Sequence, residues 1–352
     1  MRFSVVFPAY NVASYIREAI LCVTESGYED LEVIVVNDGS TDSTSKVVNE
    51  TIKGKENVRF IDRQENKGVS ETRNEGLKNA KGDYVLFLDS DDCIEKNLFK
   101  KLDEKIREAE MMGVLPDMVV FGLYEDYYEN DEKKYEKIHS CPGGLFLANG
   151  GEYKENDVLY KAVELEKETL LGYPWNKAYK RLFLEKNGFR FKKITHIEDI
   201  LFNVDAVKRA FSLLVIDEPL YHYRNEGQKR LTSKRLDNYF NLQKKRVSAV
   251  LSISEDAKDI AASEYYRSFM SMIEREIAAG QSREEIISMS EKEAGDELYK
   301  GFSDYVPPGR KLKILYAPIM EGNFKKAYFY AKVIHTIKEK APMVFAAAKQ
   351  ER

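Results

Sequence analysis

The chain has 352 residues, of which 43% are hydrophobic and 32% charged, with 9 prolines. This composition is typical of a soluble globular protein and excludes collagen-like, disordered and disulfide-scaffold classes. No apolar run approaches the ~20 residues of a membrane-spanning helix, and we expect no export signal at the start. The three cysteines, Cys22, Cys93 and Cys141, show no CxxC spacing and cannot all pair, which favours a reducing compartment. We therefore expect a cytoplasmic protein.

The net charge of −4 is unevenly distributed. Residues 310–352 carry 10 Lys/Arg and 3 Asp/Glu, so the other 309 residues have a charge of −11. Binding to nucleic acid as a main activity requires a continuous basic face, which an acidic body does not provide. We expect no nucleic-acid partner. The basic C-terminal segment is the only candidate for binding to an anionic surface.

The first 125 residues alternate short apolar runs with helical periodicity, which predicts repeated βα units. Asn11 and Asp42 precede two of the periodic segments and are expected to cap the helices. We predict an α/β fold with a Rossmann-like, doubly wound, mostly parallel sheet, which binds ligands beyond the carboxyl ends of its strands. The expected strands are 3–7, 31–36, 58–61, 84–88 and 118–121.

The rest of the chain has three sections. Residues 124–160 are rich in Tyr, Asp, Glu, Asn and Gly with weak periodicity, and are expected to form an irregular insertion. Residues 170–225 mix strand and helix patterns. From about Leu236 the pattern is helical, interrupted at Pro307 to Gly309. We therefore expect one domain over 1–230 and a mainly helical region with a basic tail over 231–352.

Several common catalytic motifs are missing from the sequence. No GxGxxG follows the first expected strand, and neither GxxxxGK[ST], HExxH nor a Cys/His zinc spacing occurs. Nicotinamide dehydrogenases, P-loop nucleotidases and zinc hydrolases therefore lose their main sequence support.

Acidic residues stand at the strand ends instead. Asp89 and Asp91 directly follow the run at 84–88, and alternate residues of an extended segment point to the same side. Such a pair of carboxylates suits Mg²⁺ or Mn²⁺, which share their coordination with substrate phosphates and water. The alternative is that this loop, including Asp92, only turns the chain or caps a helix, as Asp42 can also do.

Four segments, VVFPAYN, VVNDGSTD, NKGVSETRNEGLKNAKGDYVLFLDSDD and IED, occur in this order. Together they resemble glycosyltransferase family 2, inverting enzymes with a Rossmann-like domain of the glycosyltransferase A type. The resemblance covers residues 3 to about 100, then 175–177, 198–199 and 221–224, and leaves out the C-terminal third. It implies that residues 1–123 bind a nucleotide-sugar donor and residues 124–230 an acceptor.

The resemblance also implies which residues bind the nucleotide: Pro8, Ala9, Tyr10, Asn11, Asp38, Gly68, Arg73, Asp89 and Ser90. Tyr10 would stack on the base, and Asp38 would accept a hydrogen bond from the uracil imide, which favours UDP. The alternatives are that Tyr10 is a capping aromatic and that Asp38 forms a turn with Gly39.

The resemblance implies that the diphosphate and its metal ion bind near Arg73, Asp89 and Asp91. Arg73 would lie near the diphosphate or brace the acidic loop, although it can also be a surface ion pair. Asp91 is implied as the principal metal ligand, with Asp89 nearer the ribose or a metal-bound water. The implied cofactor is Mn²⁺ or Mg²⁺.

An inverting transfer needs a base that takes the proton of the acceptor hydroxyl. The resemblance implies Asp199 for this role, with Glu198 supporting it or binding the acceptor. Thr195 and Glu198 also fit an S/T-x-x-E capping box, so Glu198 can be a helix cap. Asp199 would then project from the first turn of the helix, whose dipole favours the ionised carboxylate.

Two further groups are expected near the acceptor. Trp175 is the only tryptophan and can be either an aromatic platform for a sugar or a core anchor. His222 and Arg224, with Lys229 and Arg230, can close over the diphosphate or form a solvated basic loop.

The basic C-terminal segment, 310–340, mixes lysines with aromatic residues. It can lie on an anionic membrane, at the inner face of the plasma membrane, or form a packing or oligomer contact, since its apolar residues fall on two helix faces.

The residues and the resemblance together predict a metal-dependent, inverting hexosyl- or N-acetylhexosaminyltransferase. It would move a sugar from a UDP-sugar to a hydroxyl of a glycan or lipid-linked glycan in surface-polysaccharide synthesis. Two alternatives stay open: a nucleotidyltransferase that makes nucleotide sugars, although no Gly-rich basic loop follows residues 3–7, and a non-catalytic nucleotide-sugar-binding protein.

Overall fold

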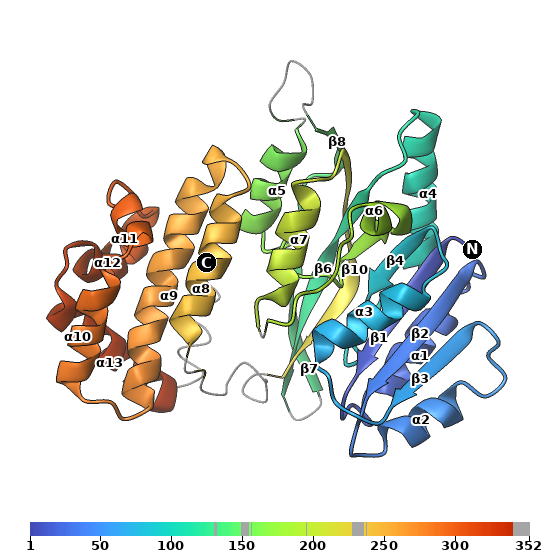
Figure 1. Cartoon of the computed structure of the whole chain (residues 1–352), viewed down its shortest axis with the longest axis horizontal. Helices are drawn as coiled ribbons and strands as arrows, with labels where there is room; N and C mark the ends of the chain where they lie inside the picture. Colours follow the sequence, from blue (N-terminus) through green and yellow to red (C-terminus); the bar gives the residue numbers. More distant parts are fainter. Residues whose placement is uncertain are drawn as a thin grey trace. The chain divides into compact units, whose positions relative to one another are not determined.

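The computed structural model describes residues 1–129, 132–148, 155, 157–194, 196–226, 236 and 238–340. Its contacts divide the chain into two compact units, Met1–Thr232 and Ser233–Arg352 (Figure 1). In the described ranges, no helix combines the length and the apolar character needed to cross a membrane.

The first unit begins with the repeated strand–helix pattern that the sequence predicts. Its elements are β1 (Phe3–Ala9), α1 (Ile16–Thr24), β2 (Leu31–Asp38), α2 (Thr44–Thr51), β3 (Val58–Arg63), α3 (Val69–Asn79) and β4 (Tyr84–Phe87). These four strands are parallel and lie in the order β3-β2-β1-β4, so their carboxyl ends meet at one edge.

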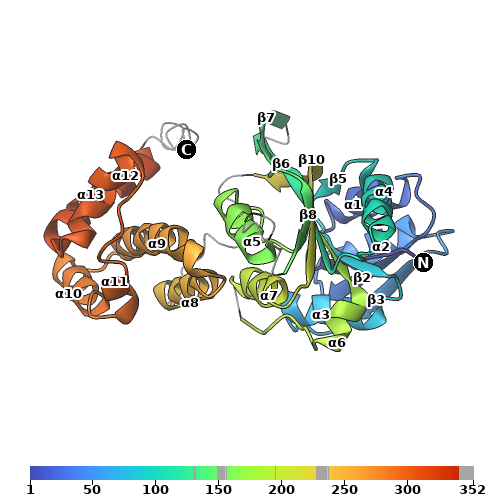
Figure 2. The ribbon, with the colours of Figure 1, turned by 90° about the horizontal axis from the view of Figure 1, so that it is seen from above.

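A second group of strands extends the sheet beyond β4. Its elements are β5 (Cys93–Ile94), α4 (Leu98–Met111), β6 (Met118–Glu129), β7 (Glu132–His139), β8 (Gly144–Leu147), α5 (Val158–Lys167), β9 (Lys177–Lys180), α6 (Arg181–Lys186), α7 (Glu198–Val207) and β10 (Ser212–Asn225). Within the described residues the sheet has ten strands. Eight of them lie in the order β3-β2-β1-β4-β9-β6-β10-β5, and the other two, β7 and β8, pair with β6 and β10. Helices α3, α6 and α7 cover one face, and α1 and α4 the other (Figure 2). The expected Rossmann-like fold class is confirmed.

The expectation of an irregular insertion at 124–160 was wrong, because most of this range forms strands. β6 runs on to Glu129 and pairs with β7 as an antiparallel hairpin, and β8 pairs with β10. Nearly all of β7 is exposed. A ribbon with water on both faces carries no alternating apolar pattern, so periodicity could not mark it as strand.

The expectation that Asn11 and Asp42 cap helices was wrong. Helix α1 begins at Ile16, several residues after Asn11, and α2 begins at Thr44, two residues after Asp42. Asn11 has a positive φ of 53°, and its Oδ1 accepts hydrogen bonds from the backbone N–H groups of Thr41 and Asp42. Asp42 accepts from the N–H groups of Ala13 and Thr44. The two side chains therefore hold together the loops that follow β1 and β2.

Two of the three cysteines form a disulfide, which their spacing in the sequence did not predict. Cys22 of α1 and Cys93 of β5 form a disulfide across a separation of 71 residues, and Cys141 is free and buried. The disulfide is at variance with the expectation of a reducing compartment.

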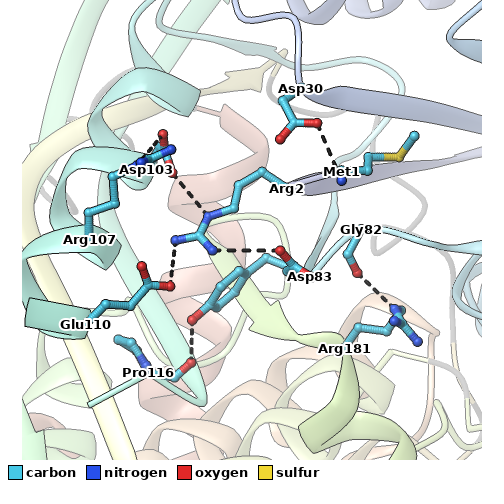
Figure 3. Close-up of polar contacts among 11 residues, drawn as sticks. Met1, Arg2, Asp30, Gly82, Asp83, Asp103, Arg107, Glu110, Pro116 and Arg181 are labelled. Atoms are coloured by element: carbon cyan, nitrogen blue, oxygen red, sulfur yellow. Dashed lines mark hydrogen bonds and ion pairs between the residues drawn. The ribbon is translucent and has the colours of Figure 1, made fainter. Parts of the chain in front are cut away.

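Arg2 organises the edge of the sheet at the amino ends of the strands (Figure 3). Its guanidinium pairs with Asp103 at 3.1 Å and Glu110 at 3.0 Å, both on α4, and lies over the ring of Tyr84 at 5.5 Å. The Arg2 side chain is only 13% exposed, and its ion pairs join the start of β1 to α4.

Arg2→Ala is expected to lower the free energy of unfolding by about 2 kcal/mol, because it removes the cation that joins Glu110 and Asp103 of α4 to β1, and Asp103 keeps only part of its hydrogen bonding, from Arg107. Urea denaturation measures the change. Arg17→Ala is the control, since Arg17 pairs with Glu50 at the surface and should change stability by less than about 0.5 kcal/mol. Equal losses in both variants would contradict the role given to Arg2.

The second unit is helical, as expected. Its elements are α8 (Tyr239–Leu251), the 3-10 turn η4 (Glu255–Ala257), α9 (Lys258–Ala278), α10 (Arg283–Glu293), α11 (Glu297–Gly301), α12 (Gly309–Met320) and α13 (Phe324–Lys340). Helix α9 packs against α8, α10, α12 and α13, and its buried Tyr265, Tyr266 and Phe269 form the centre of an aromatic core.

Candidate functional site

The acidic loop, residues 89–92, lies at the carboxyl end of β4, beside the end of β1. Ser90 is buried, and its hydroxyl donates a 2.6 Å hydrogen bond to the carbonyl of Pro8. The loop is therefore attached to the segment Pro8, Ala9, Tyr10 and Asn11. In this segment Ala9 is buried, whereas Tyr10 is 47% exposed at the rim of the site.

Arg73 connects three parts of the fold. It projects from α3, is only 3% exposed, and donates to Asp89 Oδ1 at 3.0 Å and to Asp199 Oδ1 at 2.5 Å. Asp199 stands in the first turn of α7. One guanidinium thus brings together the acidic loop and the expected base, which are far apart in the sequence. The position fits an arginine that braces the acidic loop, because its side chain is too buried for a surface ion pair.

The carboxyl groups of Asp91 and Asp199 have raised pKa values. Burial raises the pKa of Asp199 to about 7, with a further upward effect from Glu198 and Asp89, although the Arg73 charge opposes it. Burial and the neighbouring Asp89 charge raise the pKa of Asp91 to about 6, although its side chain reaches solvent. Besides burial, the Asp89 charge beside Asp91 contributes to this shift, and a bound cation would offset it.

Glu198 precedes Asp199 and lies deeper in the protein. It is 9% exposed, and its Oε2 has no hydrogen-bond partner among the described residues. Ile197 occupies the position before the helix, and Thr195, the other half of the expected capping box, lies outside the described residues. Glu198 is thus a buried carboxylate beside the expected base, Asp199.

A hydrogen bond between Asp92, the last residue of the acidic loop, and Tyr221 of β10 holds the loop in place. The sequence did not predict this contact. The Tyr221 hydroxyl donates to Asp92 Oδ2 at 2.6 Å and accepts from the N–H of Asp89 at 3.3 Å. The N–H of Arg224 donates to the other Asp92 oxygen at 2.7 Å. Burial raises the pKa of Asp92 well above its usual value. The segment 221–224 appeared in the family resemblance, but these contacts depend on the pairing of β10 with β5.

Asp38 is 3% exposed and its carboxylate is fully engaged. It accepts hydrogen bonds from the N–H groups of Lys67 at 2.9 Å and Gly68 at 2.8 Å, and it pairs with Arg63 at 2.8 Å. Gly68 has a φ of +92° at the start of α3, a conformation that favours glycine. A uracil imide could bind only at the remaining acceptor site of Oδ2 or in place of one of these donors. Arg63 was missed because the contact depends on strand register, which places it beside Asp38.

Trp175 is 2% exposed and occupies the middle of an aromatic stack. Its ring lies 4.4 Å from that of Tyr221 and 4.7 Å from that of Tyr173, both nearly parallel to it. This is the position of a core anchor rather than of a platform open to a sugar. Tyr173, at 40% exposure, is the most exposed ring of the stack.

His222 and Arg224 are both held by acidic and aromatic neighbours. His222 lies between Asp126 at 2.8 Å and Glu95 at 3.0 Å. Arg224 lies 4.0 Å from the ring centre of Tyr128 and 5.2 Å from that of Tyr15, and its Nε donates to Glu226. Neither side chain belongs to a freely solvated loop. Lys229 and Arg230 lie outside the described residues.

The donor set suits a cation shared with a ligand rather than one enclosed by protein. In the parts of the chain that the structure describes, no group of three or more His, Cys, Asp or Glu side chains is arranged to hold a metal. Asp89 and Asp91 supply carboxylate oxygens, and Mg²⁺ or Mn²⁺ commonly takes its other ligands from water and phosphate.

Comparison with known proteins identifies relatives of the first unit. A family model described as glycosyl transferase family 2 matches residues 4–182. The glycosyltransferase GlyA of Streptococcus pneumoniae serotype 4 is 31% identical over 63% of this chain and 30% of its own length. EpsJ of Bacillus subtilis, an uncharacterized glycosyltransferase, is 31% identical over 63% of this chain and 60% of its own length. The chain thus matches less than two thirds of either relative.

TarS of Staphylococcus aureus, a poly(ribitol-phosphate) beta-N-acetylglucosaminyltransferase, is 28% identical over 65% of this chain and 36% of its own length. The crystal structure of TarS 1–349 in complex with UDP-GlcNAc superposes with a TM-score of 0.60 at 19% identity, covering 94% of this chain and 91% of that structure. The likeness of fold therefore extends into the helical unit, where the sequence motifs gave no guidance.

Proposed function

Since the chain belongs to glycosyltransferase family 2, we propose that it transfers a sugar, with inversion, from a UDP-sugar to a hydroxyl group of a glycan or lipid-linked glycan. One observation carries the proposal. Asp199 and Asp89 of the acidic loop that follows β4 are both hydrogen-bonded by the same buried arginine, Arg73, so the expected base and the expected diphosphate site adjoin each other. An inverting transferase needs a base on one side of the anomeric carbon and diphosphate binding on the other.

Asp199 is the base in this proposal. Its carboxylate takes the proton of the acceptor hydroxyl as that oxygen attacks the anomeric carbon, and the bond from this carbon to the diphosphate oxygen breaks on the opposite face. The electron pair leaves with the nucleoside diphosphate. Arg73 holds Oδ1 of Asp199, while Oδ2 accepts no hydrogen bond from the other described residues and 26% of the side chain is exposed. The base is thus oriented and still accessible.

Asp91 and Asp89 would hold Mn²⁺ or Mg²⁺, which would stabilise the negative charge of the departing diphosphate. The chain itself supplies the rigidity of that corner. Asp92, with both oxygens engaged by Tyr221 and Arg224, keeps the loop in place, and Ser90 attaches it to β1. Ligands held in advance in this way lower the cost of orienting the diphosphate.

UDP-GlcNAc is the donor that we propose first, because TarS is named a beta-N-acetylglucosaminyltransferase and its structure holds that nucleotide sugar. The names of the relatives also favour a role in surface-polysaccharide synthesis. The pocket for the sugar would lie near Tyr173, whose exposed ring can pack against its C–H face.

The decisive experiment is UDP release from a panel of UDP-GlcNAc, UDP-GalNAc, UDP-glucose and UDP-galactose, with GDP-mannose as a control, in Mn²⁺, Mg²⁺ or EDTA. We expect slow hydrolysis of UDP-GlcNAc in the presence of metal, at least about tenfold above the EDTA background. Acceleration by one acceptor class would identify the acceptor. Metal-independent release, or no release from any donor with unchanged nucleotide binding, would contradict the proposal.

A further inference from the structure

Helix α13 has two apolar faces, of which one is buried and the other exposed. Phe324, Ala327 and Ala331 are buried against the rest of the helical unit, in which α13 packs on α9, α10 and α12. The ring of Phe324 stacks on Phe269 of α9 at 5.9 Å. This face anchors the helix in the unit, which leaves the opposite face to be explained.

The opposite face carries a ridge of large apolar side chains. Phe329 is 61% exposed, Val333 43% and Ile337 37%. Their spacing of four residues places them above one another on one side of the helix, over a rise of about 12 Å. Exposed apolar side chains that line up in this way mark an interaction surface more often than isolated ones do.

Lysines surround this ridge. Helix α13 has five lysines and one glutamate. Lys338 pairs with Glu274 at 2.7 Å, on the side that faces α9. Four others are exposed, and at helical spacing they fall beside the ridge: Lys325, Lys326, Lys332 and Lys340. We call this set, with Phe329, Val333 and Ile337, the outer face of α13.

We propose that the outer face of α13 docks on an anionic membrane surface. Phe329, Val333 and Ile337 enter the boundary between headgroups and acyl chains, and the lysines lie at the lipid phosphates. An apolar ridge flanked by cations is the composition that such a surface recognises, since each lysine near an anionic leaflet strengthens binding by about fivefold. A single helix is also convex, and a bilayer can receive a convex ridge without a matching groove.

Charge argues against a second copy of this chain as the occupant. Pairing two outer faces would bring eight exposed lysines together, with Glu339 of each copy as the only acidic residue of the helix. Like charges in one contact destabilise it. An anionic bilayer supplies the opposite charge along the whole helix.

The proposal concerns a surface of the second unit and does not depend on the proposed sugar transfer. It is tested with the full chain by sedimentation with vesicles of phosphatidylcholine alone or mixed with phosphatidylglycerol. We expect binding only to the mixed vesicles, weakened by high salt. K325E/K326E/K332E should lower binding by at least a factor on the order of a hundred, and F329S/V333S should lower it by at least about tenfold.

The matched control is K46E/K78E/K100E, which changes the net charge equally at three exposed lysines of α2, α3 and α4. The control should lose far less binding, although a weak general effect of net charge remains. Each variant should keep the thermal transition and the donor hydrolysis of the wild type. Equal loss in the control and the α13 variant would overturn the proposal, as would equal binding to both vesicles. Concentration-dependent dimerisation abolished by F329S/V333S, without vesicle binding, would also overturn it.

Discussion

Asp199→Asn is expected to lower the kcat of sugar transfer by about a thousandfold while changing the affinity for UDP by less than about threefold. The carboxylate is the only proposed acceptor of the hydroxyl proton, and general-base catalysis contributes about 10² to 10⁴ in rate. Asparagine keeps the volume and an oxygen that can accept from Arg73, so the arginine and Asp89 stay in place. Stopped assays of transfer, together with calorimetric titration of UDP in Mn²⁺, separate the two quantities.

The pH profile gives an independent test of the same residue. Burial raises the pKa of Asp199 to about 7. Below that pH the group is protonated and cannot accept a proton, so the kcat/KM of the wild type should rise with pH to about 7 and then level off. The residual activity of Asp199→Asn should lack this rise.

Asp205→Asn is the matched control for Asp199→Asn. Asp205 lies on the same helix, α7, and pairs with Lys192 near the surface. The same chemical change there should leave kcat, UDP affinity and the pH profile close to those of the wild type. If Asp199→Asn weakened UDP binding as much as it slowed transfer, Asp199 would belong to nucleotide binding and not to proton transfer.

Asp91→Asn is expected to remove the gain in UDP affinity that Mn²⁺ provides and to lower kcat/KM by about 10² to 10³. Asp91 is the proposed principal metal ligand, and a metal that stabilises the leaving diphosphate contributes several kcal/mol. Asparagine keeps the shape of the side chain but removes the charge that holds a divalent cation. Titration of UDP with Mn²⁺ or with EDTA measures the change.

The surface pair of Asp30 with the N-terminal amine offers a control at the opposite edge of the sheet. Asp30→Asn should leave the metal dependence unchanged. A variant Asp91→Asn that still bound UDP more tightly in Mn²⁺ than in EDTA would exclude Asp91 as the principal ligand. Asp89 would then be the remaining carboxylate of the acidic loop proposed to hold the metal.

Sequence patterns sufficed to predict the first half of the sheet and the place of the acidic loop. The apolar runs that become β1 to β4 are fully buried or nearly so in three of the four strands, so their boundaries show in composition. Parallel strands bring their carboxyl ends to one edge, which placed Asp89 and Asp91 there in advance. Family resemblance, and not periodicity, supplied Asp199.

The contacts between distant segments could not be predicted in the same way. The pair of Asp38 and Arg63 depends on the register of β2 and β3, which neither run specifies by itself. The burial of Trp175 depends on β10 lying close enough for Tyr221 to stack on it. Arg73 makes one contact of each kind. Its position beside the acidic loop was one of the expectations, whereas its hydrogen bond to Asp199, 126 residues away in the sequence, was not predicted.

The aromatic stack also gives the chain an optical reporter of its own. Trp175 is the only tryptophan, so the indole emission of the whole protein comes from one buried ring. That ring touches Tyr221, and the Tyr221 hydroxyl is bonded to Asp92 and to the backbone of Asp89. Occupation of the neighbouring corner by a nucleotide or an ion can therefore be followed by fluorescence of the unlabelled polypeptide.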